Sequence, residues 1–262
     1  MRRVASAVVI VALCLPIGAR QGASPPFASD VAIVVSPHPD DEAYAMGQTI
    51  ASQDLAGRRV VGVLVTDGDA SQHVAWWVDE RGRDMDGDGD MDRWDFGLAR
   101  REEYEAAMAI LGADEIICLG TSDTQAASGF SDTRVDEAGL TPELVRIGQE
   151  YPGADWFTTA PYLPEGGIDG DLRDHPDHAQ VALAVGAAAA QTGGSAHYFK
   201  AYEYLLPAWR RTARVYVRGE PEALARKRRA VAAFGVIGRH STPELYEAAI
   251  TDPLEYLVGT GR

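Results

Sequence analysis

Apolar residues along this chain recur with two periods, and the change from one to the other predicts its secondary structure. Short apolar runs bounded by turn residues predict buried strands, and longer stretches with an apolar residue at every third or fourth position predict helices. The expected strands are Val31–Ser36, Arg59–Thr66, Glu115–Leu119, Trp156–Ala160, His197–Leu205 and Arg214–Val217. The expected helices are Ala43–Ala56, Leu98–Leu111, Thr141–Tyr151 and Asp177–Gln191, followed by two that begin at Pro221 and Pro243.

Strands that alternate with helices predict an α/β fold, because the crossover between parallel strands is usually a helix. We expect a Rossmann-like, mainly parallel sheet flanked by helices, with a mixed C-terminal part. No linker or repeat divides residues 30–262, so we expect a single domain there, with an acidic insertion at about 69–96.

The first residues predict export. Basic Met1-Arg2-Arg3 precedes an uncharged, mostly apolar stretch, and Ala19 or Ala23 marks the expected cleavage. We therefore expect residues 1–29 to be a signal peptide and a loose leader, and the mature protein to be secreted or periplasmic without a membrane span. An uncleaved N-terminal anchor is the alternative.

Charge narrows the class of partner. The formal net charge is −15 at pH 7, and it becomes more negative when Arg2 and Arg3 leave with the leader. Such a surface repels nucleic acid and anionic lipid, so we expect neither as a partner. The basic run Arg226–Arg229 lies on an expected helix, and we interpret it as a solvated face without a function.

The first expected strand is followed by Pro37-His38-Pro39-Asp40-Asp41-Glu42, and α/β sheets bind ligands beyond the carboxyl ends of their strands. His38 and Asp41 can reach the same cation across one turn, which leaves Asp40 free to act as a base. A second cluster, Asp174-His175-Pro176-Asp177-His178, repeats this theme in a chain with only six histidines, so we expect one shared metal site. The structural alternative is that Asp40 and Asp41 cap a helix and His38 is a turn residue.

These clusters, together with Thr66-Asp67-Gly68, the pattern from Arg100 to Gly112 and Leu119-Gly120 followed by Asp123, resemble the zinc-dependent de-N-acetylase family. That family includes the LmbE-like proteins, the N-acetylglucosaminyl-phosphatidylinositol deacetylase (PIG-L) and the deacetylases of the mycothiol and bacillithiol pathways. The resemblance runs from about Val31 to Ala190, with the motifs in the same order.

The resemblance implies a catalytic zinc ion with its fourth position left to water. The implied zinc ligands are His38, Asp41 and His178. It further implies that Asp40 is the general base for that water, and that His175 stabilises the oxyanion or protonates the departing amine. Asp177 would hold His175 charged, and its structural alternative is to be the N-cap of the helix that it begins.

The resemblance also implies substrate contacts. Arg100 and Asp123 match positions that hold the hydroxyl groups or the reducing-end group of the substrate, although Arg100 beside Glu103 could equally form a surface ion pair. Some members carry a tyrosine where this chain has Arg173, which could donate to the substrate in its place or pair with Asp174 at the rim.

The acidic insertion carries a second metal signature. Oxygen ligands at alternate positions of a short loop, with glycine where the loop turns sharply, are typical of EF-type calcium sites. The candidate ligands are Asp84, Asp86, Asp88, Asp90, Asp92 and Asp95, around Gly89. We expect calcium there, and a solvated acidic loop is the alternative. Three tryptophans of the insertion would stack on a sugar ring or pack beneath the loop: Trp76, Trp77 and Trp94.

These residues together predict an exported zinc-dependent amidohydrolase, an N-deacetylase that removes an acetyl or short acyl group from an N-acylated sugar or glycoconjugate. An amidase on another amide-linked conjugate is a second enzymatic hypothesis. A calcium-dependent carbohydrate-binding protein without activity is a third, and the joint presence of Asp40 and His175 argues against it.

Overall fold

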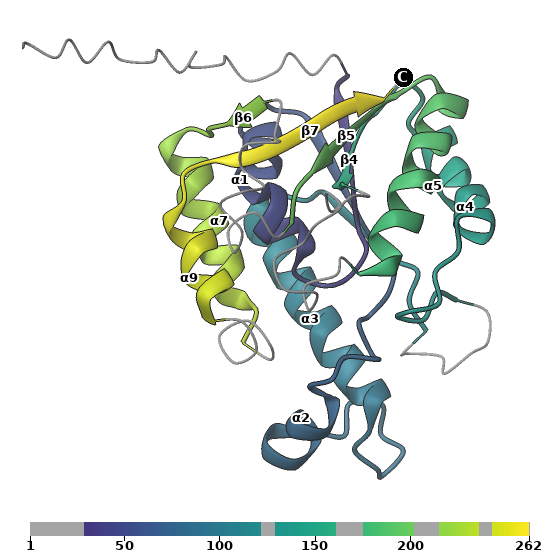
Figure 1. The fold of residues 1–262 in the computed structure, drawn as a ribbon, viewed down its shortest axis with the longest axis vertical. Coiled ribbons are helices and arrows are strands. Elements are labelled where there is room, and N and C mark those ends of the chain that lie inside the picture. The colour runs from purple at the N-terminus through teal and green to yellow at the C-terminus, as the bar shows by residue number, and fades with distance from the viewer. Residues whose placement is uncertain (1–28, 122–128, 161–174, 202–214, 236–242, 262) are drawn as a thin grey trace, which may run out of the picture.

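The structure is a computed structural model that describes residues 29–121, 129–160, 175–201, 215–235 and 243–261. Within these ranges a seven-stranded sheet in the order β3-β2-β1-β4-β5-β7-β6 has helices on both faces (Figure 1). The strands are β1 (Val31–Ser36), β2 (Arg59–Leu64), β3 (Glu115–Cys118), β4 (Asp155–Thr159), β5 (Ser195–Phe199), β6 (Val215–Val217) and β7 (Glu255–Gly261). The helices are α1 (Asp41–Leu55), α2 (Val74–Arg81), α3 (Arg93–Leu111), α4 (Glu137–Glu150), α5 (Pro176–Thr192), α7 (Pro221–Ala233) and α9 (Pro243–Thr251).

The sheet confirms the expected α/β fold. Strands β3, β2, β1, β4 and β5 are parallel neighbours, whereas β7 runs antiparallel to both β5 and β6. The apolar pattern did not predict β7, whose short run is interrupted by glycines and whose partners lie far away in the sequence. The C-terminal part is therefore mixed, as expected.

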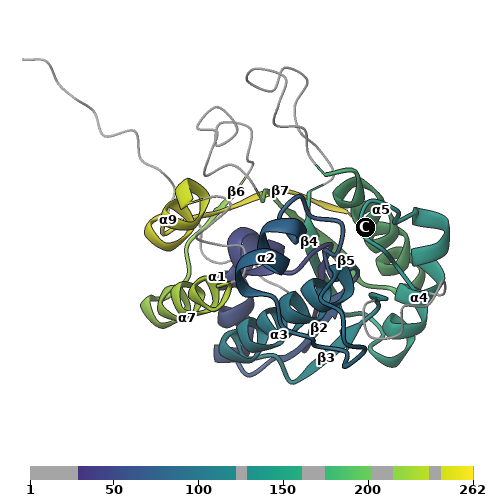
Figure 2. The ribbon, with the colours of Figure 1, turned by 90° about the horizontal axis from the view of Figure 1, so that it is seen from below.

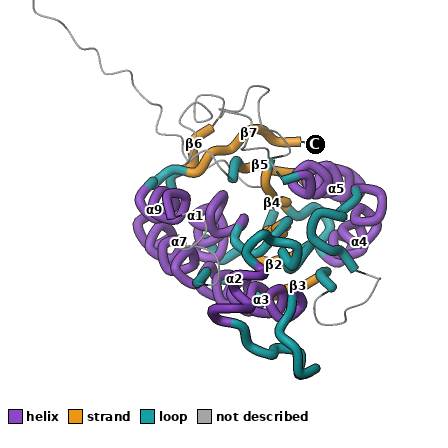
Figure 3. Tube along the Cα trace, turned by 60° about the horizontal axis from the view of Figure 1, so that its bottom comes forward, coloured by secondary structure: helices purple, strands orange, loops and turns teal. Residues whose placement is uncertain are grey.

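Two apolar clusters cover the two faces of the sheet, and the side chains of β1 alternate between them. Ala32 and Val34 belong to the cluster with α1, α3, α7 and α9, and Ile33 and Val35 to the cluster with α4 and α5. Figures 2 and 3 show the same division, with α4 and α5 on one side and α1, α7 and α9 on the other. These β1 side chains are fully buried, as expected for a strand covered on both faces.

The basic run on α7 is not a solvated face throughout, which corrects the interpretation made from the sequence. Lys227 is fully buried, and its ammonium group lies 3.0 Å from a carboxylate oxygen of Glu255 in β7. Glu255 also accepts hydrogen bonds from the amides of Gln48 and Thr49, at 2.8 and 2.9 Å. These amides follow Met46, where α1 leaves helical geometry, so Glu255 caps the second half of a kinked helix.

Three other helices differ from expectation, and one of them is α3, which begins at Arg93 and not at the expected Leu98. Asp136 caps α4 by accepting a hydrogen bond from the amide of Gly139 at 2.8 Å, so α4 begins at Glu137 and the expected start at Thr141 is wrong. Helix α2 was not expected, because it forms within the insertion, where Trp77 packs edge-on against the ring of Phe96 in α3 with 5.7 Å between the ring centroids. No helix among the described residues combines the length and the apolarity needed to cross a membrane.

Candidate active site

The two histidine clusters border one crevice. The chain leaves β1 toward β2 on one side, and later returns through β4 to pair with β1 on the other. A crevice forms beyond the carboxyl ends of the strands where the strand order reverses in this way. The first cluster joins β1 to α1, and His175 to His178 begin α5 after β4, so the fold brings the clusters together.

Three side chains from these clusters converge. Asp41 Oδ2 lies 3.2 Å from His38 Nδ1 and 3.2 Å from His178 Nε2, and the three ligand atoms lie within 4.8 Å of one another. Ligands held about 2.0–2.2 Å from a tetrahedral zinc ion lie roughly 3.3–3.6 Å apart, so the donor set and its spacing fit zinc. The structure thus brings together the residues that the resemblance implies as ligands.

The charges of these groups favour a cation at their centre. Burial would raise the pKa of Asp41, but His178 and His38 hold it well below its usual range. Burial would lower the pKa of His38, but the carboxylates of Asp132, Asp177 and Asp41 hold this pKa well above its usual value. The site therefore stabilises positive charge, which is what a bound metal ion would supply.

Asp40 lies beside the three donors and faces the cavity. Its φ of 123° is rare for a residue with a side chain, and its carboxylate makes no capping hydrogen bond to α1, so the structural alternative of a side-chain cap is wrong. The carboxylate instead accepts a hydrogen bond from Arg100 Nη2 at 3.0 Å. Burial raises the pKa of Asp40 to about 6, even though Arg100 lowers it, which suits a proton acceptor near neutral pH.

His175 packs edge-on against His38, with 4.2 Å between the ring centroids. It is the N-cap of α5, since its Nδ1 accepts a hydrogen bond from the amide of Asp177 at 3.4 Å, so Asp177 is not the cap. Asp177 Oδ2 lies 3.6 Å from His175 Nδ1 and accepts a hydrogen bond from the amide of Thr133 at 2.8 Å. Burial and His38 hold the pKa of His175 below its usual value although Asp132 and Asp177 raise it, so Asp177 alone does not keep His175 charged.

Sequence reasoning missed Asp132. This residue is 5% exposed, and its Oδ1 lies 3.4 Å from His38 Nε2 and 3.3 Å from His175 Nε2. Burial would raise the pKa of Asp132, but the hydrogen bond and charge of His38 hold it at about 2. No local pattern marks Asp132, because its loop is placed at the site by contacts with distant segments, among them the bridge between Phe130 and Gly120 and the hydrogen bond from the amide of Thr133 to Asp177.

Of the predicted substrate contacts, Arg100 lies at the site, whereas Asp123 and Arg173 lie outside the described residues. Arg100 is 5% exposed and donates to the carbonyl of Pro39 as well as to Asp40, so it is not a surface residue. Gly68 permits this approach, because a Cβ there would clash with the guanidinium group.

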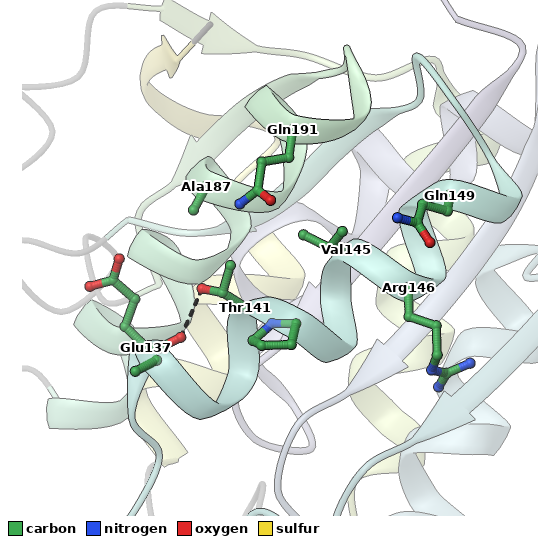
Figure 4. Close-up of a pocket in the computed structure, with 9 residues that line it drawn as sticks. Glu137, Thr141, Val145, Arg146, Gln149, Ala187 and Gln191 are labelled. Atoms are coloured by element: carbon green, nitrogen blue, oxygen red, sulfur yellow. Dashed lines mark hydrogen bonds between the residues drawn. The ribbon is translucent and has the colours of Figure 1, made fainter.

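A cavity of about 380 Å³ opens onto these groups, and residues 70–73 of the insertion form part of its wall. Its other lining residues are His38, Asp40, Arg100, Asp132 and His175. A larger groove of about 680 Å³ runs along α4 and α5 and is lined by none of these residues (Figure 4). We assign the chemistry to the smaller cavity because the metal-ligating and titratable side chains cluster there.

Five of the six aspartates of the acidic loop fall into two groups. The carboxylates of Asp84, Asp86 and Asp88 lie within 4.8 Å of one another and are exposed. Asp92 and Asp95 instead form the capping box of α3, and Asp95 also accepts hydrogen bonds from the amides of Met85 and Asp86. The structure thus brings three of the six together, while Asp90 lies outside that group and Asp92 and Asp95 serve backbone amides.

Comparison with known proteins identifies relatives. Diacetylchitobiose deacetylase of Thermococcus kodakarensis is 31% identical over 147 residues, which are 56% of this chain and 44% of that protein. The match therefore spans less than half of the length of this relative. N,N'-diacetylchitobiose deacetylase from Pyrococcus horikoshii is similar in structure, with a TM-score of 0.57 and 19% identity over 89% of this chain and 83% of that chain.

A protein of a different activity is similar to the same degree. GalB, the 4-carboxy-2-hydroxymuconate hydratase from Pseudomonas putida KT2440, has a TM-score of 0.57 and 17% identity over 84% of this chain and 82% of that chain. These structural likenesses therefore show the fold alone. The sequence profile of the PIG-L family, described as GlcNAc-PI de-N-acetylase, matches residues 33–189, which is more than half of the chain, and the chain belongs to that family.

Proposed function

We propose that this protein is a zinc-dependent N-deacetylase. The observation that carries the proposal is the convergence of His38, Asp41 and His178 at spacings that fit zinc, with the carboxylate of Asp40 facing the same cavity. Three protein ligands leave one position of a tetrahedral zinc ion open, as hydrolysis requires. The named activity of the diacetylchitobiose deacetylases supports the same reaction class.

The residues of the cavity divide the work of amide hydrolysis. When bound, zinc would acidify a water molecule and polarise the carbonyl group of the amide. Asp40 takes the proton from the attacking water, and the hydrogen bond from Arg100 orients its carboxylate. His175 donates a hydrogen bond to the carbonyl oxygen as that oxygen gains charge or, once it is protonated itself, hands a proton to the departing amine, with Asp132 and Asp177 beside its ring nitrogens.

The substrate that we propose is an N-acetylated sugar or glycoconjugate. Acetate release from a panel of N-acetylated sugars, glycan fragments and glycolipids, by zinc-loaded protein, tests this directly. We expect release from at least one member and none after zinc is removed by a chelator. If zinc-loaded protein releases no acetate from any of them but cleaves another amide-linked conjugate, the second enzymatic hypothesis is correct.

The zinc site has a test that does not depend on the substrate. We expect the wild-type protein to bind one zinc ion per chain at this site and His178→Ala to lose it, because two remaining protein ligands make an inadequate site. Metal analysis after dialysis measures this, with His197→Ala as the control, since His197 contacts Asp155 rather than the zinc donors. Stoichiometric zinc in His178→Ala would contradict the assignment.

We also propose calcium binding by the exposed carboxylates of Asp84, Asp86 and Asp88, where mutual repulsion favours a divalent cation. Extracellular calcium modules work at about 0.1–1 mM, so weak binding would suffice outside the cell. Calcium should then raise the melting temperature of wild type but not of Asp84→Ala/Asp88→Ala. Equal melting with calcium and with chelator would show that the loop is only a charged insertion.

Export is the third proposal, and the N-terminal basic and apolar sequence supports it. We expect the mature protein to be secreted or periplasmic and to begin after Ala19 or Ala23. Mass spectrometry of the intact protein, after expression with its own N-terminus, measures the mass that is lost. An unprocessed chain in the membrane fraction would support an uncleaved anchor instead.

A further inference from the structure

We propose that Asp132 is a positioning residue that holds His38 and His175 in the tautomers the site needs. Asp132 lies on the loop before α4, outside both histidine clusters, and its Oδ1 faces Nε2 of both rings, at 3.4 and 3.3 Å. One carboxylate oxygen is thus the common neighbour of a zinc donor and of the proposed acid. The inference deepens the proposed function and rests on it for its kinetic part.

The tautomer of His175 follows from its two neighbours. Its Nδ1 accepts a hydrogen bond from the amide of Asp177 at 3.4 Å, so in the neutral ring the proton is on Nε2. Nε2 lies 3.3 Å from Oδ1 of Asp132, and its N–H is the donor that the proposed function assigns to the substrate carbonyl. Asp132 therefore contacts the ring from the side opposite to α5, and it favours the tautomer in which Nδ1 carries no proton and accepts the hydrogen bond that caps α5.

The same argument holds for His38. Its Nδ1 faces Asp41, with His178 beyond, so zinc at this point requires Nδ1 without a proton and places the proton on Nε2. Nε2 lies 3.4 Å from Asp132 and 3.4 Å from Asp177. Zinc-ligating histidines commonly donate their other N–H to a carboxylate, and removal of that partner typically costs about 10–100-fold in metal affinity or activity.

Two further hydrogen bonds fix the position of Asp132. Its Oδ2 accepts a hydrogen bond from the amide of Ala70 at 3.3 Å, and its own amide donates to Asp69 Oδ1 at 3.4 Å. Asp69 is almost fully buried and lies 3.7 Å from Arg93 of α3. One oxygen of the Asp132 carboxylate thus binds the cavity wall at Ala70, and the other lies beside the rings of His38 and His175. The position of the wall and the position of the two histidines are therefore linked through Asp132.

Two readouts test the role, and the first needs no substrate. In Asp132→Asn we expect zinc affinity, measured by competition with a chromogenic chelator, to fall about 10–100-fold. At saturating zinc we expect kcat to fall by a similar factor while KM stays within about twofold, because the residue acts through the histidines and not on the substrate. The matched control is Asp136→Asn, an exposed residue of the same loop whose capping role asparagine can keep.

Nitrogen-15 spectra of the histidine rings in wild-type zinc-loaded protein test the proposal even if Asp132→Asn does not fold. At mildly alkaline pH we expect both His38 and His175 as Nε2–H tautomers. The proposal is overturned if either ring carries its proton on Nδ1, or if Asp132→Asn keeps wild-type zinc affinity. A rise in KM alone would overturn it too, and would place Asp132 on the substrate. If the protein releases no acetate, the zinc affinity of Asp132→Asn and the tautomers of the two histidines still test the role of Asp132.

Discussion

Asp40 occupies a backbone conformation that a residue with a side chain rarely adopts, and this turns its carboxylate away from α1 and into the cavity. The strained backbone directs the carboxylate toward the cavity and not toward the first amides of α1, which suits a proton acceptor. Arg100 reaches this carboxylate only because Gly68 leaves room for its guanidinium group. The position and the charge of the Asp40 carboxylate, the proposed base, thus depend on three separate segments of the chain.

Asp40→Asn should keep zinc and lose turnover by about a hundredfold or more, because asparagine fills the same space but cannot take a proton. Steady-state kinetics with metal analysis of the same samples measures both effects. Asp30→Asn, an exposed aspartate at the start of β1, is the control and should behave as wild type. Near-normal turnover with zinc retained would place the base elsewhere.

At the scale of elements, α1 is bent where it packs against α7 and β7. The break at Met46 exposes amides that Glu255 caps, and Lys227 neutralises this carboxylate inside the core. The kink therefore depends on a charge pair between elements that follow α1 by more than 170 residues, which explains why the basic run appears solvated in the sequence.

Lys227→Met should lower the free energy of unfolding by about 3–5 kcal/mol, because it leaves a buried carboxylate without its counter-charge. Urea unfolding measures this. Arg229→Met is the matched control from the same basic run, and its exposed side chain should change stability by less than about 0.5 kcal/mol. Equal stability of the two variants would mean that Lys227 contributes no more than a surface residue.

At the scale of the whole molecule, the sheet has a second polar cluster at the amino end of β4, away from the crevice. Asp155 lies 2.7 Å from Arg58 and 3.1 Å from His197 of β5. Burial would raise the pKa of Asp155, but the hydrogen bonds from His197 and Arg58 hold it below its usual value. Burial lowers the pKa of His197, although Asp155 opposes this.

Both shifts predict that acid destabilises the fold through this cluster. As the pH falls below about 6.5, histidine in the unfolded chain binds a proton before folded His197 does. The stability that neutral His197 gives to the fold is therefore lost as the pH falls further below this value. Asp155 adds a loss at lower pH, as the pH falls from the unfolded toward the folded pKa. The difference in unfolding free energy between wild type and His197→Gln, in metal-free protein, should therefore narrow between about pH 7 and pH 5. A constant difference would contradict this account.

Much of the fold could be predicted from local patterns. The buried parallel strands and the helices beside them have continuous apolar runs or amphipathic periods, and the structure places β1 and β3 and the C-terminal end of α3 within a residue of expectation. The start of α4 could not be placed, because Asp136 as cap outweighed Pro142 as a start signal. β7 could not be predicted either, since its partners come from other parts of the chain.

For the candidate site, the sequence by itself was enough to predict that the two histidine clusters come together, because each cluster follows a strand and begins a helix. Only the tertiary structure decided what surrounds them. Asp132 lies at the site through the placement of its loop, and Arg100 lies there through the packing of α3. Asp92 and Asp95 are helix caps because α3 begins one residue after Asp92. Hydrogen-bond partners depend on which backbone amides lie near, and that is a property of the folded chain.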